Sequence, residues 1–354
     1  MNTIAICILL GSFIFLLAIK TPISFALLTS SVLTSLYLQL PLMSTMVQLV
    51  KGIHSFSLMA IPFFILAGEI MGQGGISKRI IAFTNVLVGR VRGGLAQVNI
   101  LASTFFGGIS GSAIADVSSI GAMMIPMMKD SGYDADYSVD VTITSACQGL
   151  IIPPSHNMII FAVSAGGLSV GKLFLGGMVP GVTLGIALMI VSYVIAVKRN
   201  YPKGKKISLR EALKVTADAI LGLMTAIIII GGVIGGVFTA TESAAIACLY
   251  AFIITFFVYR EIPLRTIGKI LDNSLKTLSM VLALLSCCNV FGWLLAYLQV
   301  PALVTSALLG ISSNRIVLLL LINLLLLALG CVMDMAPLIM ITTPILLPVT
   351  QSIG

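Results

Sequence analysis

The chain contains a succession of apolar stretches that are long enough to cross a lipid bilayer as helices. A membrane-spanning helix needs about 20 apolar residues. Stretches of roughly this kind cover residues 4–19, 22–40, 56–72, 138–166, 174–197, 215–237, 243–259 and 277–298. Apolar residues make up 58% of the chain and charged residues 9%, which is too much apolar surface for one soluble core to cover. The sequence therefore predicts an all-α polytopic membrane protein, and it excludes soluble enzymes, disordered chains and β-barrels.

Two further apolar stretches are too long for one span and are interrupted in the middle. Residues 94–128 break at the small residues 107–112, and residues 314–350 break around residues 330–337. A chain that turns inside the bilayer leaves helix-end N–H and C=O groups unpaired, so such turns occur where protein, water or a ligand satisfies them. We therefore expect each stretch to form a re-entrant hairpin of two half-helices.

The positions of the basic residues support these hairpins. If the N-terminus faces outside and both hairpins return to their side of origin, only Lys51, Lys172 and Arg315 of the 20 basic residues lie outside. An excess of Lys and Arg in inside loops is the usual bias of membrane proteins. The net charge of +8 thus indicates topology and not a nucleic-acid surface. The six cysteines form no C-x-x-C pair, so no metal site or disulfide is expected.

A basic segment with Pro and Gly at residues 201–211 is the predicted cytoplasmic linker between two halves. Residues 1–200 are expected to form a first repeat of two spans, a third span, a hairpin, a broken span and a closing span. Residues 212–354 are expected to form a second repeat of opposite orientation that lacks the last two of these elements. Inverted repeats of this kind are typical of secondary transporters.

Two interrupted segments of the first half carry the predicted chemistry. At the tip Ser110-Gly111-Ser112, hydroxyls and helix-end carbonyls suit a cation, whereas helix-end N–H groups suit a carboxylate. In the later span, Pro153 and Pro154 cannot continue a helical ladder. The simpler interpretations are a helix contact with a cap at the tip and a proline kink in the span.

Ionisable residues at membrane depth are functional hypotheses by default. Asp116 follows the first tip and Asp334 lies at the second tip, where it could also simply cap the second arm. His156, beside the proline pair, could titrate or contact a substrate. The two aspartates could also serve an intramembrane aspartyl protease, but neither lies in a Gly-x-Gly-Asp sequence. We therefore do not expect an enzyme.

The tip sequence at residues 108–116 resembles the large permease subunit, of DctM type, of the tripartite ATP-independent periplasmic (TRAP) transporters. The sequences at residues 61–69, 152–155, 238–242 and 343–348 share this resemblance, in the expected order. The resemblance implies an elevator-type sodium symporter that imports an organic acid across the bacterial inner membrane, with its N-terminus in the periplasm. It also implies two partners, a periplasmic solute-binding protein of DctP type and a small four-helix membrane subunit of DctQ type.

The resemblance also implies the site residues. The first sodium region would use Ser110, Gly111, Ser112, Gly149, Pro153 and Ser155. A second ion region would use the tip residues Gly330, Met333, Asp334 and Pro337. From the chemistry of the residues themselves, we expect the substrate to contact Ser112, His156, Asn157 and Asp334. Sodium would be the coupling ion, and no other cofactor is expected. His156 departs from the family, in which an aliphatic residue usually follows the Pro-Pro-Ser sequence.

Members of the family continue past the second hairpin with a second broken helix, whereas this sequence ends at Gly354. We therefore expect a C-terminally truncated subunit that does not transport alone. Two alternatives stay open, a stand-alone sodium/anion carrier of a related superfamily and a non-transporting subunit. A C4-dicarboxylate, a sialic acid or another sugar acid would all suit a small anion site, and no arginine cluster selects one of them.

Overall fold

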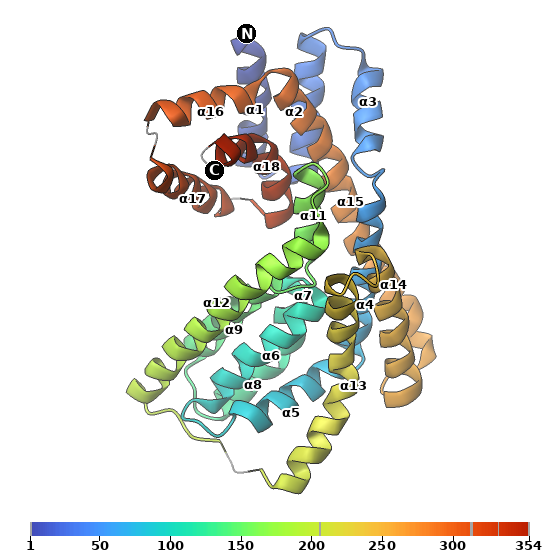
Figure 1. Cartoon of the computed structure of the whole chain (residues 1–354), viewed down its shortest axis with the longest axis vertical. Coiled ribbons are helices and arrows are strands. Elements are labelled where there is room, and N and C mark those ends of the chain that lie inside the picture. The colour runs from blue at the N-terminus through green and yellow to red at the C-terminus, as the bar shows by residue number, and fades with distance from the viewer. Residues whose placement is uncertain (1, 205–206, 312–313, 332, 353–354) are drawn as a thin grey trace. The chain divides into compact units, whose positions relative to one another are not determined.

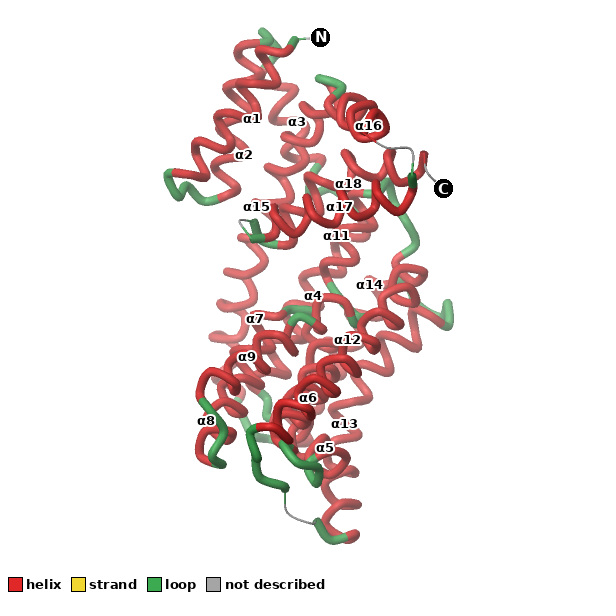
Figure 2. The backbone as a smooth tube through the Cα atoms, turned by 90° about the vertical axis from the view of Figure 1, so that its left-hand side faces the viewer, coloured by secondary structure: helices red, strands yellow, loops and turns green. Residues whose placement is uncertain are grey.

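The computed structural model describes residues 2–204, 207–311, 314–331 and 333–352. Over these ranges the chain is built from helices joined by mostly short loops, and the only β-type pairing is one isolated bridge between Arg92 and Lys203 (Figure 2). The predicted all-α membrane fold is confirmed. Lys205 and Lys206 of the predicted linker, Val332 of the second tip and Gly354 lie outside the described residues.

The helices form two compact units (Figure 1). Unit 1 contains α1 (Thr3–Ala18), α2 (Ile23–Tyr37), α3 (Leu42–Lys51), α16 (Val300–Ile311), α17 (Arg315–Gly330) and α18 (Met335–Ser352). Unit 2 contains α4 (Ala60–Gln73), α5 (Ile76–Val88), α6 (Gly94–Ser110), α7 (Ala113–Asp116), α8 (Ala122–Asp130), α9 (Ala135–Ala146), α10 (Gln148–Ile151), α12 (Val170–Lys198), α13 (Leu209–Ile234) and α14 (Ala240–Ile253). Two of the boundaries between the units fall within α11 (His156–Ser164) and α15 (Ile267–Tyr297), and the other two follow Leu58 and Leu168. Each unit thus draws on both halves of the sequence, and the inverted repeat stays a prediction.

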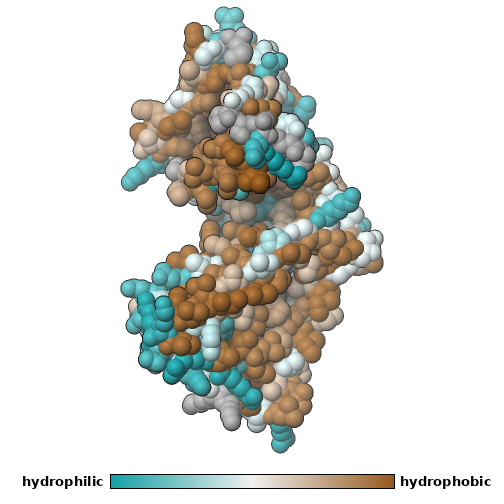
Figure 3. Space-filling model, turned by 60° about the vertical axis from the view of Figure 1, so that its left-hand side comes forward, coloured by the Kyte–Doolittle hydropathy of each residue, from teal (hydrophilic) through white to brown (hydrophobic). Residues whose placement is uncertain are grey.

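Six helical segments among the described residues are long and apolar enough to cross a membrane, at Phe56–Gln73, Val170–Lys198, Leu209–Ile234, Ala240–Tyr259, Leu264–Tyr297 and Met335–Ser352. A seventh candidate is the pair Ala135–Ile151 and His156–Ser164, which is bent by 47°. The first two predicted spans form the shorter apolar helices α1 and α2. Large brown areas in Figure 3 show apolar side chains on the outer surface, as expected where helices face lipid.

The first predicted hairpin folds back on itself. Its first arm is α6, and its second arm consists of α7, a π-helical turn at Val117–Gly121, and α8, with the arms packed together. At the start of the hairpin, Gly93 N–H donates to the carbonyl oxygen of Pro202 at 3.1 Å. Just after its end, the Tyr133 ring stacks on Tyr201 with 4.4 Å between the ring centroids. Both ends therefore lie beside the same short segment, as a hairpin that returns to its side of origin requires.

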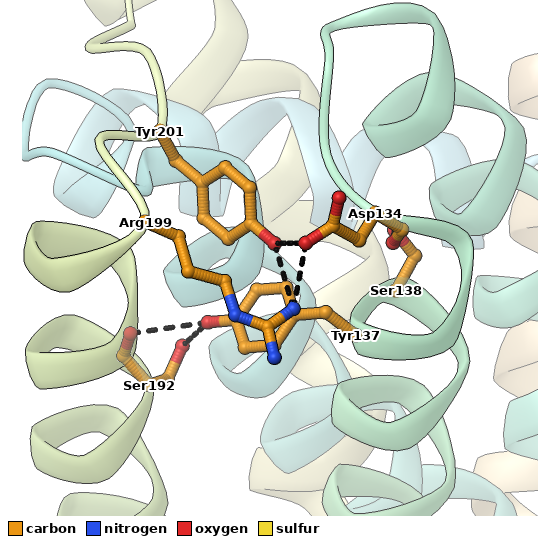
Figure 4. A network of polar contacts seen from close by, with 6 residues as sticks. All are labelled: Asp134, Tyr137, Ser138, Ser192, Arg199 and Tyr201. Carbon is orange, nitrogen blue, oxygen red and sulfur yellow. Dashed lines mark hydrogen bonds and ion pairs between the residues drawn. The ribbon is translucent and has the colours of Figure 1, made fainter.

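A polar cluster joins the end of α12 to the loop before α9 (Figure 4). The Tyr201 hydroxyl donates to Asp134 Oδ2 at 2.7 Å, and Arg199 Nη1 donates to the same oxygen at 2.6 Å. The Tyr137 hydroxyl donates to the carbonyl oxygen of Ser192 on α12 at 3.0 Å. The hydroxyl of Tyr201, followed by the Arg199 guanidinium, lowers the pKa of Asp134. We call these five residues the Tyr201 cluster, and it fastens the hairpin end to α12.

We expect Tyr201→Phe to lower the melting temperature of the purified chain at neutral pH. The substitution keeps the ring stack and removes the hydroxyl that donates to Asp134. Because the pKa of Asp134 is lowered in the folded state, the contribution is present above the ordinary carboxyl pKa of about 3.9 and disappears as the pH falls through the lowered value. Tyr193→Phe is the control, since Tyr193 is an exposed tyrosine on α12, the helix that ends just before Tyr201. Equal melting temperatures of wild type and Tyr201→Phe at neutral pH would contradict the role of the cluster.

Candidate functional site

The helix that begins at α9 is broken at the predicted prolines. An intact helix would bond the carbonyls of Gly149 and Leu150 to the N–H groups four residues later, but those residues are Pro153 and Pro154, which have none. The chain leaves the helix after α10 and re-enters it at α11. Ser155 Oγ donates to the carbonyl oxygen of Leu150 at 2.8 Å and so replaces one missing donor. The predicted break is confirmed, and the Ser155 hydroxyl stabilises the interrupted backbone.

The first hairpin turns at Gly111, which adopts a left-handed backbone conformation with φ +63°. Such a conformation favours glycine because it has no Cβ. Ser112 then begins α7, and its Oγ accepts a hydrogen bond from Ala115 N–H at 3.3 Å. Ser110 Oγ accepts from Ser112 N–H at 3.4 Å. The tip hydroxyls therefore cap the turn, as the simpler interpretation of this motif expects.

The tip of the hairpin and the break in the span meet backbone to backbone. A Cβ added to Gly149 would lie 2.7 Å from the Cα of Gly107, so α6 and α10 can approach only through this glycine pair. A Cβ on Gly108 would lie 3.2 Å from the carbonyl oxygen of Pro153, and one on Gly111 would lie 3.0 Å from that of Pro154. Two interrupted segments far apart in the sequence are thus brought together at one place.

This meeting point holds most of the site residues expected from the sequence. Ser110, Gly111, Gly149, Pro153, Ser155 and Asn157 are buried there, and Ser112 and His156 are half-buried. Gln148 is fully buried beside them, and its Oε1 accepts a hydrogen bond from Thr104 Oγ1 of α6 at 2.7 Å. No group of three or more His, Cys, Asp or Glu among the described residues could hold a metal ion. Hydroxyl and carbonyl oxygens are among the groups that lie at this meeting point.

Asp116 lies near the hairpin tip, although it is not among the residues of the implied ion region. It ends α7, one turn after the tip, and is 0% exposed. Neither of its carboxylate oxygens makes a hydrogen bond of ordinary geometry to a described residue, although the Ser103 side chain is its polar neighbour. A buried carboxylate is costly unless a cation or hydrogen-bond donors compensate it. The sequence marks Asp116 as an ionisable residue next to the tip, but only the packed structure shows its burial.

The second predicted tip lies in unit 1, between α17 and α18. Asp334 is exposed, and its carbonyl oxygen accepts a hydrogen bond from Leu338 N–H at 3.2 Å at the start of α18. Pro337 is buried, whereas Gly330 and Met333 flank the turn. Asp334 thus belongs to the other unit from Ser112, His156 and Asn157, the other residues of the expected substrate region. The helix break is at the predicted place, and the second ion region stays a prediction.

The Glu69 carboxylate of α4 accepts two side-chain hydrogen bonds. Its Oε1 accepts hydrogen bonds from Gln73 Nε2 at 2.5 Å and from Asn273 Nδ2 at 2.8 Å. On the same helix, Gly68 lies against the tip, because its added Cβ would be 3.4 Å from the Cα of Ser110. Helix α4 therefore packs closely on the hairpin tip and is tied to α15 by the Glu69 carboxylate.

Comparison with known proteins gives one family and several relatives. Residues 10–354 match the family model described as "Tripartite ATP-independent periplasmic transporter, DctM component". The chain is 43% identical to the uncharacterized protein YgiK of Salmonella typhimurium over 99% of this chain and 81% of the relative. It is 42% identical to the sialic acid TRAP transporter large permease protein SiaM of Vibrio cholerae, over 87% of this chain and 72% of the relative. It is 37% identical to the 2,3-diketo-L-gulonate TRAP transporter large permease protein YiaN of Escherichia coli, over 99% and 82%.

We expect Gly149→Ala to destabilise the fold by about 1–3 kcal/mol, because the new methyl group meets rigid backbone at Gly107. Thermal unfolding of the purified chain measures the loss. Gly176→Ala is the matched control, because Gly176 also lies in a helix and its added Cβ has no atom within 4 Å. The control is expected to be neutral or slightly stabilising. An equally mild effect at Gly149 would contradict the backbone contact between the tip and the break.

Proposed function

This chain belongs to the DctM-component family of the tripartite ATP-independent periplasmic transporters, and on that premise we propose that it forms the membrane pathway of a sodium-coupled importer of organic acids. Family members are transporters, so the chain is not an enzyme and the intramembrane protease hypothesis is set aside. The observation that carries the proposal is the contact of two discontinuous segments, the hairpin tip and the break after α10. Interrupted helices that meet in this way typically form the ion and substrate sites of secondary transporters.

The chemistry of the meeting point supports a small hard cation. Carbonyl oxygens of Pro153 and Pro154 lie close against Gly108 and Gly111, and Ser110 and Ser155 are buried. Oxygen donors without nitrogen or sulfur ligands suit ions such as sodium rather than transition metals. We propose that these four residues, with Gly111, Ser112 and Gly149, bind the coupling sodium ion.

Asp116 supports the same assignment through its charge. Its buried carboxylate has no ion-pair partner in the described part of the chain. A sodium ion at the tip would compensate this charge, and removal of the ion would leave it uncompensated. We therefore add Asp116 to the proposed ion region, as a source of negative charge one turn from the tip.

The substrate proposal rests on the start of α11. A helix N-terminus carries partial positive charge, which favours a carboxylate. His156 and Asn157 occupy this terminus. The backbone nitrogen of His156 lies close to Gly111, because a Cβ added to Gly111 would be 3.2 Å from it. We propose that the carboxylate of an organic acid binds there, and the names of the relatives make a sugar acid such as a sialic or diketogulonic acid the first class to test.

We also propose the setting and the partners. The chain would lie in the bacterial inner membrane with its N-terminus in the periplasm, a small four-helix subunit would bind it, and a periplasmic binding protein would deliver the substrate. Uptake by the chain and small subunit without any binding protein would instead favour the stand-alone sodium/anion carrier. Uptake that stays absent with both partners present would favour a non-transporting subunit.

Replacing Ser110 and Ser155 by alanine is expected to raise the sodium concentration for half-maximal uptake by roughly tenfold, the effect of losing about 1.4 kcal/mol of ion binding. The assay is organic-acid uptake by proteoliposomes that contain the complete system. Ser118→Ala is the control, because this exposed hydroxyl of the same hairpin donates to Ile114 O of its own helix. An unchanged sodium dependence in the double variant would refute the ion assignment.

Asp116→Asn tests the charge argument through stability. Without sodium, the variant is expected to melt at the same or a higher temperature than wild type, because it removes an uncompensated buried charge. With sodium, the stabilisation seen in wild type is expected to be lost. The control is Asp130→Asn, an exposed carboxylate of the same hairpin. A variant that melts lower without sodium and still gains full stability from sodium would contradict this role for Asp116.

A further inference from the structure

A groove of about 300 Å³ lies between α9 and α12, next to the Tyr201 cluster and apart from the proposed ion site. Its walls include the apolar side chains Val141, Leu188 and Ile195, and its rim carries Asp136, Asp140 and Arg199. Apolar walls and a charged rim in one groove fit an amphiphilic molecule rather than a water-soluble anion or a bare ion. The groove has no part in the proposed transport chemistry.

The exposed faces of both helices change character at this groove. On α9, exposed Asp136 and Asp140 are followed one and two turns later by exposed Ile143 and Cys147. On α12, exposed Val191 and Val194 are followed by Lys198 and Arg199. Figure 3 shows this kind of transition at the lower left, where brown surface gives way to teal. A helix surface that changes from apolar to charged within about 10 Å marks the level of lipid headgroups.

The charges on the rim restrict which headgroup fits. Asp136 and Asp140 lie one helical turn apart, and no hydrogen bond or ion pair to either carboxylate occurs among the described residues. Arg199 uses Nη1 for Asp134 and Tyr201, and its side chain is still 50% exposed. With two carboxylates and one guanidinium, this rim repels a purely anionic headgroup. It matches a headgroup that carries both a cation and a phosphate.

Position in the helix explains only one of the two carboxylates. Asp136 lies in the first turn of α9, where the helix dipole favours a negative charge. Asp140 lies beyond that turn, so the dipole gives no reason for a carboxylate at the apolar edge of the groove. A cation that binds from outside the chain would be a reason for a carboxylate at this position.

We propose that this groove binds a zwitterionic phospholipid whose headgroup carries a primary ammonium, as in phosphatidylethanolamine. The ammonium group pairs with Asp136 and Asp140, because its three N–H donors suit two neighbouring carboxylates. The phosphate accepts from the free edge of the Arg199 guanidinium, and the upper part of an acyl chain covers Val141 and Ile195. A bound lipid would join α9 to α12 on the side where the Tyr201 cluster also joins them. This inference does not depend on the proposed transport function.

The test uses the full-length chain in nanodiscs of phosphatidylcholine to which phosphatidylethanolamine or phosphatidylglycerol is added at equal mole fractions. We expect phosphatidylethanolamine to raise the melting temperature more than phosphatidylglycerol does. The double variant carries Asp136→Asn and Asp140→Asn. In it, the mole fraction of phosphatidylethanolamine that gives half of the increase in melting temperature should rise roughly two- to fivefold, as expected for the loss of exposed ion pairs. High salt should also reduce the increase in melting temperature that phosphatidylethanolamine causes in the wild type, because salt screens exposed ion pairs.

Asp130→Asn is the matched control, because it removes an exposed carboxylate that does not line the groove. Three results would overturn the proposal: an equal or greater response to phosphatidylglycerol, no response of the wild type to phosphatidylethanolamine, or an equal loss in the control variant. If the double variant does not fold, the comparison of the lipids on wild type decides, supported by counting lipids that stay bound in native mass spectrometry. Because none of these measurements uses transport, failure here leaves the proposed function untouched.

Discussion

The site depends on one constraint, which is the loss of backbone hydrogen bonds where two adjacent prolines interrupt a helix. Pro153 and Pro154 leave the carbonyls of Gly149 and Leu150 without their usual donors, within a pair of helices that is apolar enough to cross a membrane. The chain compensates with the Ser155 hydroxyl and by placing the hairpin tip directly against the break. The break in the helix is thus the place where the backbone of the hairpin tip contacts the backbone of the second segment.

Glycines and the Tyr201 cluster hold this arrangement from opposite ends of the hairpin. At the tip, Gly107 and Gly149 allow two backbones to touch, which any larger side chain would prevent. At the other end, the Tyr133–Tyr201 stack and the Asp134 hydrogen bonds fasten the loop before α9 to the end of α12. The hairpin is therefore fixed at both ends, and its tip is positioned by packing and not by hydrogen bonds alone.

The sequence predicts those features that depend on local chemistry. Proline chemistry locates the break, and small residues locate the turn at Gly111, because each acts within a few residues of itself. The Thr104–Gln148 bond and the burial of Asp116 could not be predicted, since they depend on which helix faces meet. Helices that are apolar on all sides carry little information about their neighbours. For the same reason the two compact units, which mix both halves of the chain, have no counterpart in the sequence pattern.

The oxygen atoms of Pro153 and Pro154 that face the tip belong to the main chain, whereas His156 and Asn157 contribute side chains next to them. Main-chain atoms are common to all amino acids, so point mutation cannot delete them as long as the local geometry survives. Side chains, in contrast, change with every substitution. In the proposed site, a substitution at His156 or Asn157 would therefore change the contacts offered to the organic acid, while the carbonyl oxygens of Pro153 and Pro154 would stay in place for the ion.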